Sequence, residues 1–232
     1  MNKFLILMLM TSLLSVSCNK SGDGGSSSDE TQTAPVTGDD STGTDTSGGD
    51  DTTSTPAPTP TPNVPAQALT FSTNVELLNF NTDQAAKYNE AIELVKLVVG
   101  TEEFRNKVLN HTYNGIKQFA DNGGKTNAQI YQSILDAAEK LYPAKNNRMD
   151  LEVELYYANN TVVGYTNGST TQIWVNTKFF NNYKVNSVAG NLFHEWLHKL
   201  GYGHDSAATA KRPYSVPYAI GYIMADIAQD FM

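Results

Sequence analysis

The sequence contains almost no cysteine, no excess of basic residues and no hydrophobic run long enough to span a membrane. Cys18 is the only cysteine among 232 residues, so the chain cannot form an internal disulfide. The apolar stretch 4–14 is too short for a transmembrane helix, which needs about 20 residues. The formal net charge of −8 implies no basic surface for nucleic acid.

Large apolar side chains are also scarce in residues 19–66, where Ser, Thr, Gly, Asp and Pro dominate. Such a segment cannot bury enough apolar surface to offset the entropy lost on ordering, so we expect a disordered, acidic tether. Its proline-rich end, 56–62, is typical of a stiffer polyproline spacer. Residues 67–232 carry sixteen acids and fourteen bases, so the expected folded domain is nearly neutral.

Residues 1–18 have the pattern of an export signal. Lys3 precedes the apolar stretch, and the small residues 15–17 lead directly to Cys18. This pattern resembles a bacterial lipoprotein signal peptide, in which the cysteine becomes the lipidated N-terminus of the mature chain. The resemblance implies export and membrane anchoring through Cys18 to the cell envelope, at the outer membrane or the cell surface. The alternative is a secreted product without a lipid.

Helices dominate the first part of the expected domain. The spacing of apolar residues predicts N-terminal helices over 82–99, 102–109 and 126–141. Thr101 and Thr126 are suitable N-caps for the second and third of these. Nearer the C-terminus we predict a helix capped by Asn186 or Ser187 and a last helix over Ala219–Phe231.

Short strands are expected between these two groups of helices. Apolar and charged residues alternate in 151–156, and 161–166 and 171–176 are extended stretches separated by turn residues. The short links predict an antiparallel meander. The order of elements therefore predicts an α+β fold with N-terminal helices, a small, mainly antiparallel sheet and two C-terminal helices.

Five residues between positions 194 and 204 have the spacing of a metal site. His194 and His198 are four apart, so a helix places them on one face. Gly201 can end this helix in the left-handed conformation, which lets His204 turn back toward the same point. Glu195 directly follows the first histidine, and three of the four histidines in the chain belong to this group.

This spacing, His-Glu-x-x-His-x-x-Gly-x-x-His, resembles the zinc signature of the metzincin metallopeptidases. The resemblance implies a metzincin-like or zincin-like fold and one catalytic Zn²⁺ held by His194, His198 and His204. The fourth ligand position would be left to water, which Glu195 would activate as a general base before passing the proton to the leaving amine. It thus implies an extracytoplasmic zinc-dependent endopeptidase that hydrolyses protein or peptide substrates.

Four further residues were considered for a role at or near the proposed zinc site. Metzincins have a methionine-containing turn beneath the zinc, and Met224 is either that residue or an ordinary core methionine. Tyr218 is either a hydrogen-bond donor to the developing oxyanion or a packing residue. Asp205 either holds the loop, orients a neighbour or is a solvated acid. His111 has no metal-site spacing to the other histidines.

The stretch Thr171–Asn176 precedes the active-site helix, as the strand at the cleft edge does in metzincin-like folds. If it has that position, a substrate peptide could bind by adding a strand to its free edge. The alternative is an interior strand with Trp174 in the core.

Two other functions are compatible with part of the pattern. His-x3-His-x5-His also resembles the bacterial endoribonucleases that mature ribosomal RNA, but these carry glycine where this chain has Glu195. Export and a nearly neutral domain also argue against RNA as substrate. The non-enzymatic alternative is a surface lipoprotein that binds zinc and cleaves nothing, and the presence of Glu195 argues against it.

Overall fold

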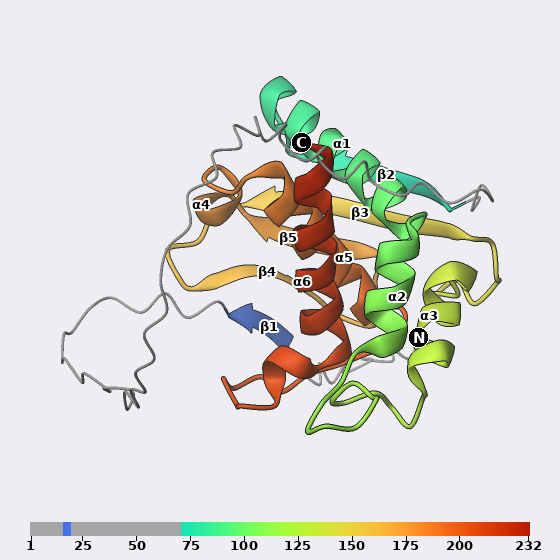
Figure 1. Cartoon of the computed structure of the whole chain (residues 1–232). Helices are drawn as coiled ribbons and strands as arrows, with labels where there is room; N and C mark the ends of the chain where they lie inside the picture. The colour runs from blue at the N-terminus through green and yellow to red at the C-terminus, as the bar shows by residue number, and fades with distance from the viewer. Residues whose placement is uncertain (1–15, 20–70) are drawn as a thin grey trace, which may run out of the picture. The chain divides into compact units, whose positions relative to one another are not determined.

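The computed structural model describes residues 71–232 and the backbone of residues 16–19. The tether and most of the signal peptide lie outside these residues, so they stay predictions, as does lipidation of Cys18. The described part is a mixed α/β fold with six α-helices and four neighbouring strands, to which a short fifth strand pairs (Figure 1). None of the described helices is both long and apolar enough to cross a membrane.

The three N-terminal helices begin at polar caps, and those of the second and third helices, Thr101 and Thr126, are the ones that the sequence predicts. They are α1 (Thr82–Val99), α2 (Glu102–Asn110) and α3 (Asn127–Asp136). Asn81, Thr101 and Thr126 each accept a hydrogen bond from a backbone N–H of the first helical turn. Helix α1 ends at Gly100, as expected.

Helix α3 ends earlier than its predicted limit at residue 141. Ala137 adopts a left-handed conformation with φ 49°, and the chain then turns toward the sheet. There the Glu139 carboxylate accepts hydrogen bonds from the Asp150 backbone N–H at 2.9 Å and from Trp196 Nε1 at 2.6 Å. These contacts hold the segment after α3 against the core, so it does not continue as a helix.

The sheet has the strand order β1-β4-β5-β3-β2. Its strands are β1 (Val16–Asn19), β2 (Ser72–Leu78), β3 (Arg148–Tyr156), β4 (Val162–Thr166) and β5 (Gln172–Asn176). Strand β3 pairs in parallel with β2 and with β5, whereas β4 is antiparallel to β5 and to β1.

The predicted antiparallel meander is therefore wrong, although its three strands exist. Strand β5 lies between β3 and β4, so the link after β3 crosses the end of β5. The buried side chain of Asn176 holds this crossing: it accepts from the Ala158 backbone N–H at 3.2 Å and donates to the carbonyls of Ala158 and Val162 at 2.9 and 3.1 Å. A long-range amide contact of this kind leaves no periodic trace in a sequence.

The chain after β5 is mainly helical. It contains α4 (Thr177–Phe180), α5 (Val185–Lys199), the 3-10 turn η1 (Arg212–Tyr214), α6 (Val216–Ala228) and the 3-10 turn η2 (Gln229–Phe231). Helix α5 packs against α1, α6 and β4, and its residues Phe193, Trp196 and Leu197 are fully buried. The expected caps of α5 are wrong, because Lys184 is the N-cap and Asn186 donates instead to the Ala225 carbonyl of α6 at 3.0 Å.

Two glycines bring α5 and α6 into close contact. A Cβ on Gly190 would lie 2.7 Å from the Gly221 carbonyl oxygen, and a Cβ on Gly221 would lie 3.2 Å from Cβ of His194. Larger residues would push the helices apart.

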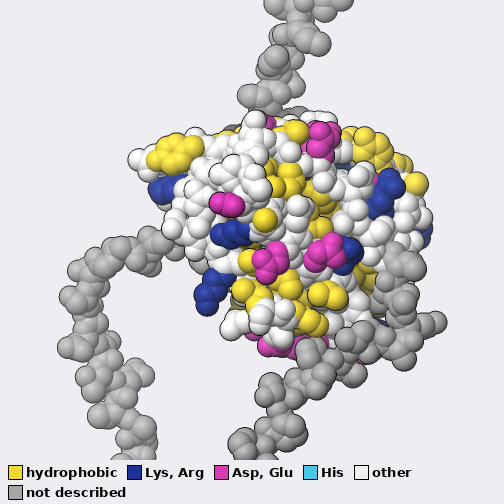
Figure 2. All heavy atoms as spheres, turned by 90° about the horizontal axis from the view of Figure 1, so that it is seen from above, with side chains coloured by type: hydrophobic (Ala, Val, Ile, Leu, Met, Phe, Trp, Pro, Cys, Tyr) yellow, Lys and Arg dark blue, Asp and Glu magenta, His cyan; other side chains and the backbone are white. Residues whose placement is uncertain are grey.

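The face of the molecule seen in Figure 2 carries basic, acidic and apolar side chains that are interspersed with one another.

Candidate metal centre

The three motif histidines converge in the folded chain. His194 and His198 lie on one face of α5, and the chain turns back after Gly201, whose φ is +98° as the predicted left-handed helix end requires. One ligand atom from each of His194, His198 and His204 lies within 4.8 Å of the others. The Nε2 atoms of His194 and His204 are 3.2 Å apart.

The other side of each ring is held by the backbone. Nδ1 of His198 lies 2.8 Å from the Tyr202 carbonyl oxygen, and Nδ1 of His204 lies 2.9 Å from that of Asp205. The His194 ring bonds the backbone of Pro217, which has no N–H, so the ring donates to its carbonyl. Because a carbonyl only accepts, His198 and His204 carry the proton on Nδ1 and direct the Nε2 lone pair at the centre of the cluster.

The environment keeps all three imidazoles in the form that binds metal. Burial, reinforced by the charges of the other two histidines and of Arg212, lowers the pKa of His194 well below its usual value. Burial also lowers the pKa of His198 to about 4 and lowers the pKa of His204. Neutral rings at neutral pH suit metal ligation, since protons do not compete for the ligand nitrogens. The three histidines could therefore hold a metal ion.

Glu195 lies beside this cluster, in the interior between α5 and β4. Its side chain is fully buried, and its Oε1 would be 3.4 Å from a Cβ placed on Gly164 of β4. Burial, with a smaller contribution from the Glu195 charge, raises the pKa of Tyr88 on α1. Burial likewise raises the pKa of Tyr156 to about 12, with Tyr165 and Glu195 adding to the effect. The charge of Glu195 thus acts on the phenols of Tyr88 and Tyr156 and, as an attraction, on the ammonium of Lys199.

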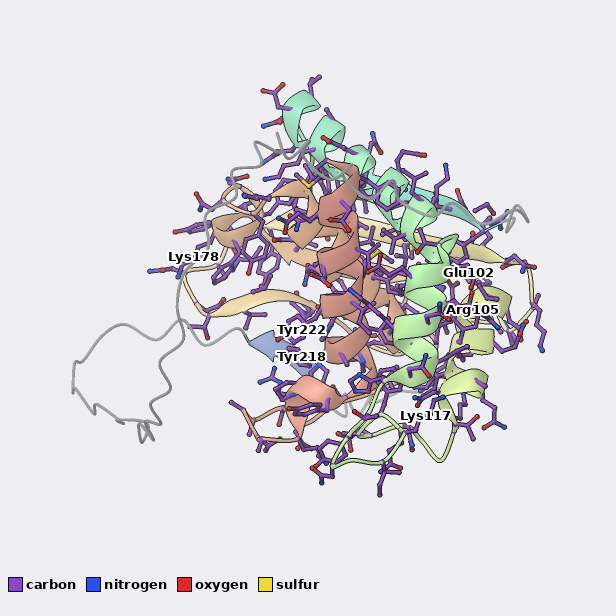
Figure 3. All side chains as sticks on the ribbon, in the orientation of Figure 1. Glu102, Arg105, Lys117, Lys178, Tyr218 and Tyr222 are labelled. Carbon is purple, nitrogen blue, oxygen red and sulfur yellow. The ribbon has the colours of Figure 1, made fainter. Side chains whose placement is uncertain are left out.

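Tyr218 stands against the histidine cluster, as its candidate role requires. Its ring centroid is 4.5 Å from that of His194 and 4.7 Å from that of His204. The Arg212 guanidinium carbon lies 4.7 Å from the same ring centroid, an arrangement that allows a cation–π contact. Figure 3 shows Tyr218 and Tyr222 on the N-terminal half of α6.

Of the two alternatives for Met224, the structure favours the core methionine. This residue is fully buried within α6 and belongs to the hydrophobic core, so it is an ordinary core methionine. The segment that contacts the cluster from the C-terminal side is instead Ser215–Tyr218, through the Pro217 carbonyl and the Tyr218 ring.

Asp205 holds the loop that follows the third histidine. Its carboxylate accepts a hydrogen bond from Thr209 Oγ1 at 2.7 Å and pairs with Lys211 at 3.3 Å, while its carbonyl faces the His204 ring. His111 is not part of the cluster; its ring stacks on Phe119 at a centroid distance of 4.1 Å.

Of the two alternatives for Thr171–Asn176, the structure has the interior strand, although Trp174 is half-buried and not part of the core. Strand β5, over Gln172–Asn176, is interior, and Trp174 stacks on Tyr165 while its Nε1 donates to Glu154 at 2.9 Å. The strand nearest the cluster is β4, whose outer edge pairs only with the short β1 among the described residues.

Sequence reasoning missed Lys199, a buried base that links α5 to the β4–β5 turn. Its Nζ donates to the carbonyls of Asn167, Thr170 and Gln172 at 3.2, 2.5 and 2.9 Å. Burial lowers the pKa of Lys199 to about 8, against the opposing effect of nearby carboxylates. Its position one helical turn after Glu195, on a helix buried along most of its length, is the signal that could have identified it.

A cavity of about 350 Å³ adjoins the cluster. His194 lines one part of it, and the remaining described walls come from α5, α6, β4, η1 with the loop before it, and Tyr183 of the α4–α5 link. Arg212 of η1, also not expected from the sequence, is among the lining residues and is 4 % exposed.

In comparisons with protein-family models, curated proteins and solved structures, no match was found for the chain. The chain is therefore classified from its structure alone. It is a mixed α/β protein with a three-histidine cluster that could hold a metal ion.

Proposed function

We propose that this chain is a metzincin-like, zinc-dependent endopeptidase that acts outside the cytoplasm. The observation that carries the proposal is the convergence of three neutral imidazoles within 4.8 Å, with the buried Glu195 next to the first of them. Histidine nitrogens suit several transition metals, and zinc is the one that combines with a His-Glu-x-x-His helix in hydrolases.

Each residue around the cluster has a role in this proposal. His194, His198 and His204 would hold the zinc ion, which when bound supplies a Lewis acid that acidifies water and polarises a carbonyl. Glu195 takes a proton from the attacking water and delivers it to the leaving amine. Tyr218 donates a hydrogen bond to the substrate carbonyl oxygen as negative charge develops there. Burial of Glu195 excludes bulk water from the proton transfer.

The edge of β4 is the proposed site for the substrate backbone. β4 runs beside Glu195 at Gly164, so a peptide paired with this strand would pass the cluster. The pairing of β1 with β4 in antiparallel register, with Cys18 opposite Gly164, is an example of an extended segment at this edge. Strand addition of this kind binds main chain and leaves alternate side chains to enter pockets.

Substitution of Glu195 by Gln tests the proposal directly. The variant should keep one zinc ion per chain and lose activity on a generic protein substrate by about 10²- to 10⁴-fold, because the amide cannot accept the proton. Metal content by atomic emission and cleavage of casein are the two measurements. Glu93→Gln, an exposed acid that pairs with Lys96 on α1, is the matched control and should retain full activity.

Three outcomes separate the competing functions. A Glu195→Gln variant as active as the parent would refute the proton-transfer role. A parent that binds zinc but cleaves no protein would indicate the non-catalytic zinc-binding lipoprotein. Cleavage of ribosomal RNA by the parent, abolished in His198→Asn, would instead indicate the endoribonuclease.

A further inference from the structure

Tyr202 lies between the second and third histidines of the cluster and contacts the second through its backbone. Its carbonyl oxygen accepts from Nδ1 of His198 at 2.8 Å, which determines the ring nitrogen that faces the cluster. The direction of this carbonyl therefore matters for any metal ion bound there. Loss of such an outer hydrogen bond typically weakens metal binding by about ten- to a hundredfold.

The backbone around Tyr202 holds its N–H more firmly than its carbonyl. The N–H donates to the Leu197 carbonyl at 3.1 Å and that of Gly201 donates to the His198 carbonyl at 3.0 Å, which are the two bonds of a Schellman helix end. The peptide that carries the Tyr202 carbonyl continues into Gly203, where an added Cβ would meet nothing within 4 Å. Packing at this glycine does not restrain the peptide, so its direction depends on how Tyr202 itself is held.

The hydroxyl of Tyr202 belongs to a chain of hydrogen bonds that reaches α3. Lys125, just before this helix, donates to the hydroxyl at 3.2 Å, and its Nζ lies 4.8 Å from the ring centroid. Oγ of Ser133 on α3 lies 2.6 Å from the same hydroxyl. Because Ser133 gives its own proton to the Ile130 carbonyl at 2.7 Å, the tyrosine is the donor in the bond between the two hydroxyls.

This chain fixes the ring of Tyr202 to an element that supplies none of the ligand histidines. Donation runs in one direction, from Lys125 through Tyr202 and Ser133 to Ile130, and hydrogen bonds in such a sequence strengthen one another. Water competes little for them at the tyrosine, which is 5 % exposed. The ring and the backbone of the same residue thus join α3 to the His198 imidazole.

We propose that Tyr202 is a positioning residue for the metal centre, through which α3 controls the orientation of the His198 ring. The proposal rests on the metal site of the peptidase proposed above. Without the hydroxyl, the ring is no longer tied to α3, and the carbonyl turns more easily away from His198. The imidazole then loses the bond that keeps its Nε2 lone pair directed at the cluster, and metal affinity falls.

Tyr202→Phe, which removes only the hydroxyl, tests the proposal with Co²⁺, whose visible absorption depends on the geometry of its ligands. We expect the affinity of the metal-free protein for Co²⁺, titrated against a chelator, to fall about tenfold, the low end of the range for an outer hydrogen bond. The absorption spectrum of the cobalt-loaded variant should also differ from that of the parent. Displacement of Co²⁺ by Zn²⁺ gives the zinc affinity in the same samples.

Two controls separate positioning from a general loss of stability. Thr101→Ala removes the N-cap of α2, where the side chain bonds Val98 and Phe104. It should unfold at a lower urea concentration than the parent and still bind Co²⁺ with the parent's affinity and spectrum. Tyr157→Phe, which removes the hydroxyl of an exposed tyrosine, should change neither stability nor binding.

The two partners of the hydroxyl provide a second test. Ser133→Ala and Lys125→Met should each lower the Co²⁺ affinity by a smaller factor than Tyr202→Phe, and they test the chain even if that variant folds poorly. In the Tyr202→Phe background, Ser133→Ala should cause no further loss, because the serine acts on the metal through the tyrosine hydroxyl. Independent effects on the fold would instead add.

These measurements use no substrate, so they separate this inference from the peptidase function. Parent affinity and spectrum in Tyr202→Phe, parent affinity in both partner variants, or additive losses in the double variant would overturn the inference and leave the peptidase function intact. A parent that binds Co²⁺ and Zn²⁺ but cleaves no protein would refute only the peptidase function. A parent that binds neither ion would overturn both.

Discussion

At the scale of single residues, the site depends on how each imidazole is oriented and kept neutral. Backbone carbonyls of Tyr202 and Asp205 accept from Nδ1 of His198 and His204 and so direct the opposite nitrogen inward. The presence of a histidine at each motif position is not sufficient for metal binding. An imidazole ring flipped by 180° would direct its N–H at the metal site, where a nitrogen lone pair is needed. These carbonyls come from the turn that Gly201 makes possible.

The lowered pKa values imply that the metal-free protein loses stability in mild acid. Between the usual histidine pKa of about 6.5 and the folded pKa of His198 of about 4, the unfolded chain binds a proton that the folded chain does not. The free energy of unfolding should therefore fall as pH drops through this range, by up to about 1.4 kcal/mol per pH unit for this ring. The pKa values of His194 and His204 are also lowered, so these two residues likewise make the free energy of unfolding fall as the pH drops.

Urea unfolding of chelator-treated protein between pH 7.5 and pH 4.5 measures this slope. The variant His198→Asn should show a shallower decline, while His111, which is also shifted down by burial, contributes equally to both proteins. A parent whose stability is constant over this range would contradict the burial of the three rings as neutral groups.

At the scale of elements, α5 carries the site and its neighbours determine what surrounds it. Lys199 joins the helix to the β4–β5 turn, and β4 in turn faces Glu195 at Gly164. On its other side, α5 touches α6 through Gly190 and Gly221. A displacement of β4 or of α6 would thus shift α5 and, with it, the histidines of the cluster.

Lys199→Met should detach the β4–β5 turn from α5. Three carbonyls would lose a charged donor, and we expect a loss of roughly 1–3 kcal/mol in the free energy of unfolding. Activity should also fall, because β4 would no longer be held beside Glu195. Chemical denaturation and hydrogen exchange of residues 167–172 are the measurements. Lys178→Met, which removes contacts to Asn159 and Asn160 at the surface, is the control, and equal effects of the two variants would count against the anchoring role.

Gly190→Ala should separate α5 from α6. The added methyl would lie 2.7 Å from the Gly221 carbonyl oxygen and 2.8 Å from Cβ of Ala225, so the helices must move. Overpacking of this kind costs about 1–3 kcal/mol, and zinc affinity should fall because His194 moves with the helix. Thermal unfolding and competition with a zinc chelator test both effects. Gly168→Ala, where a Cβ meets nothing within 4 Å, should change neither.

At the scale of the whole molecule, the proposed arrangement is a nearly neutral catalytic domain joined by an acidic tether to a lipid anchor at Cys18. This arrangement is a proposal from the sequence, because residues 20–70 and the side chain of Cys18 lie outside what the structure describes.

Cys18→Ala should release the protein from the membrane fraction of a bacterial host into the soluble fraction or the medium, because no thiol would remain to carry the lipid. Fractionation, together with incorporation of labelled palmitate, measures this. Ser21→Ala is the control and should stay in the membrane. A Cys18→Ala protein that stays with the membrane, with no palmitate in the parent, would favour another mode of attachment.

Local signals in the sequence were sufficient for the presence of the helices, though not for all of their ends, and for the spacing of the motif. Thr101 and Thr126 cap helices because their side chains accept from the next turn, and His194 and His198 share a face because a helix repeats every 3.6 residues. Gly201 was predicted correctly for the same reason, since a positive φ is a local property of glycine.

Long-range contacts decided the strand order, the end of α3 and the surroundings of the histidine cluster. The place of β5 inside the sheet depends on Asn176 and its contacts across the β3–β4 link, and the end of α3 depends on Glu139 and its bond to Asp150. The described wall of the cavity beside His194 includes Arg212, which the turn η1 brings there from a distant part of the chain. The sequence by itself determined which residues could bind a metal, because ligand spacing is local. Only the tertiary structure decided what faces them, because those neighbours come from distant parts of the chain.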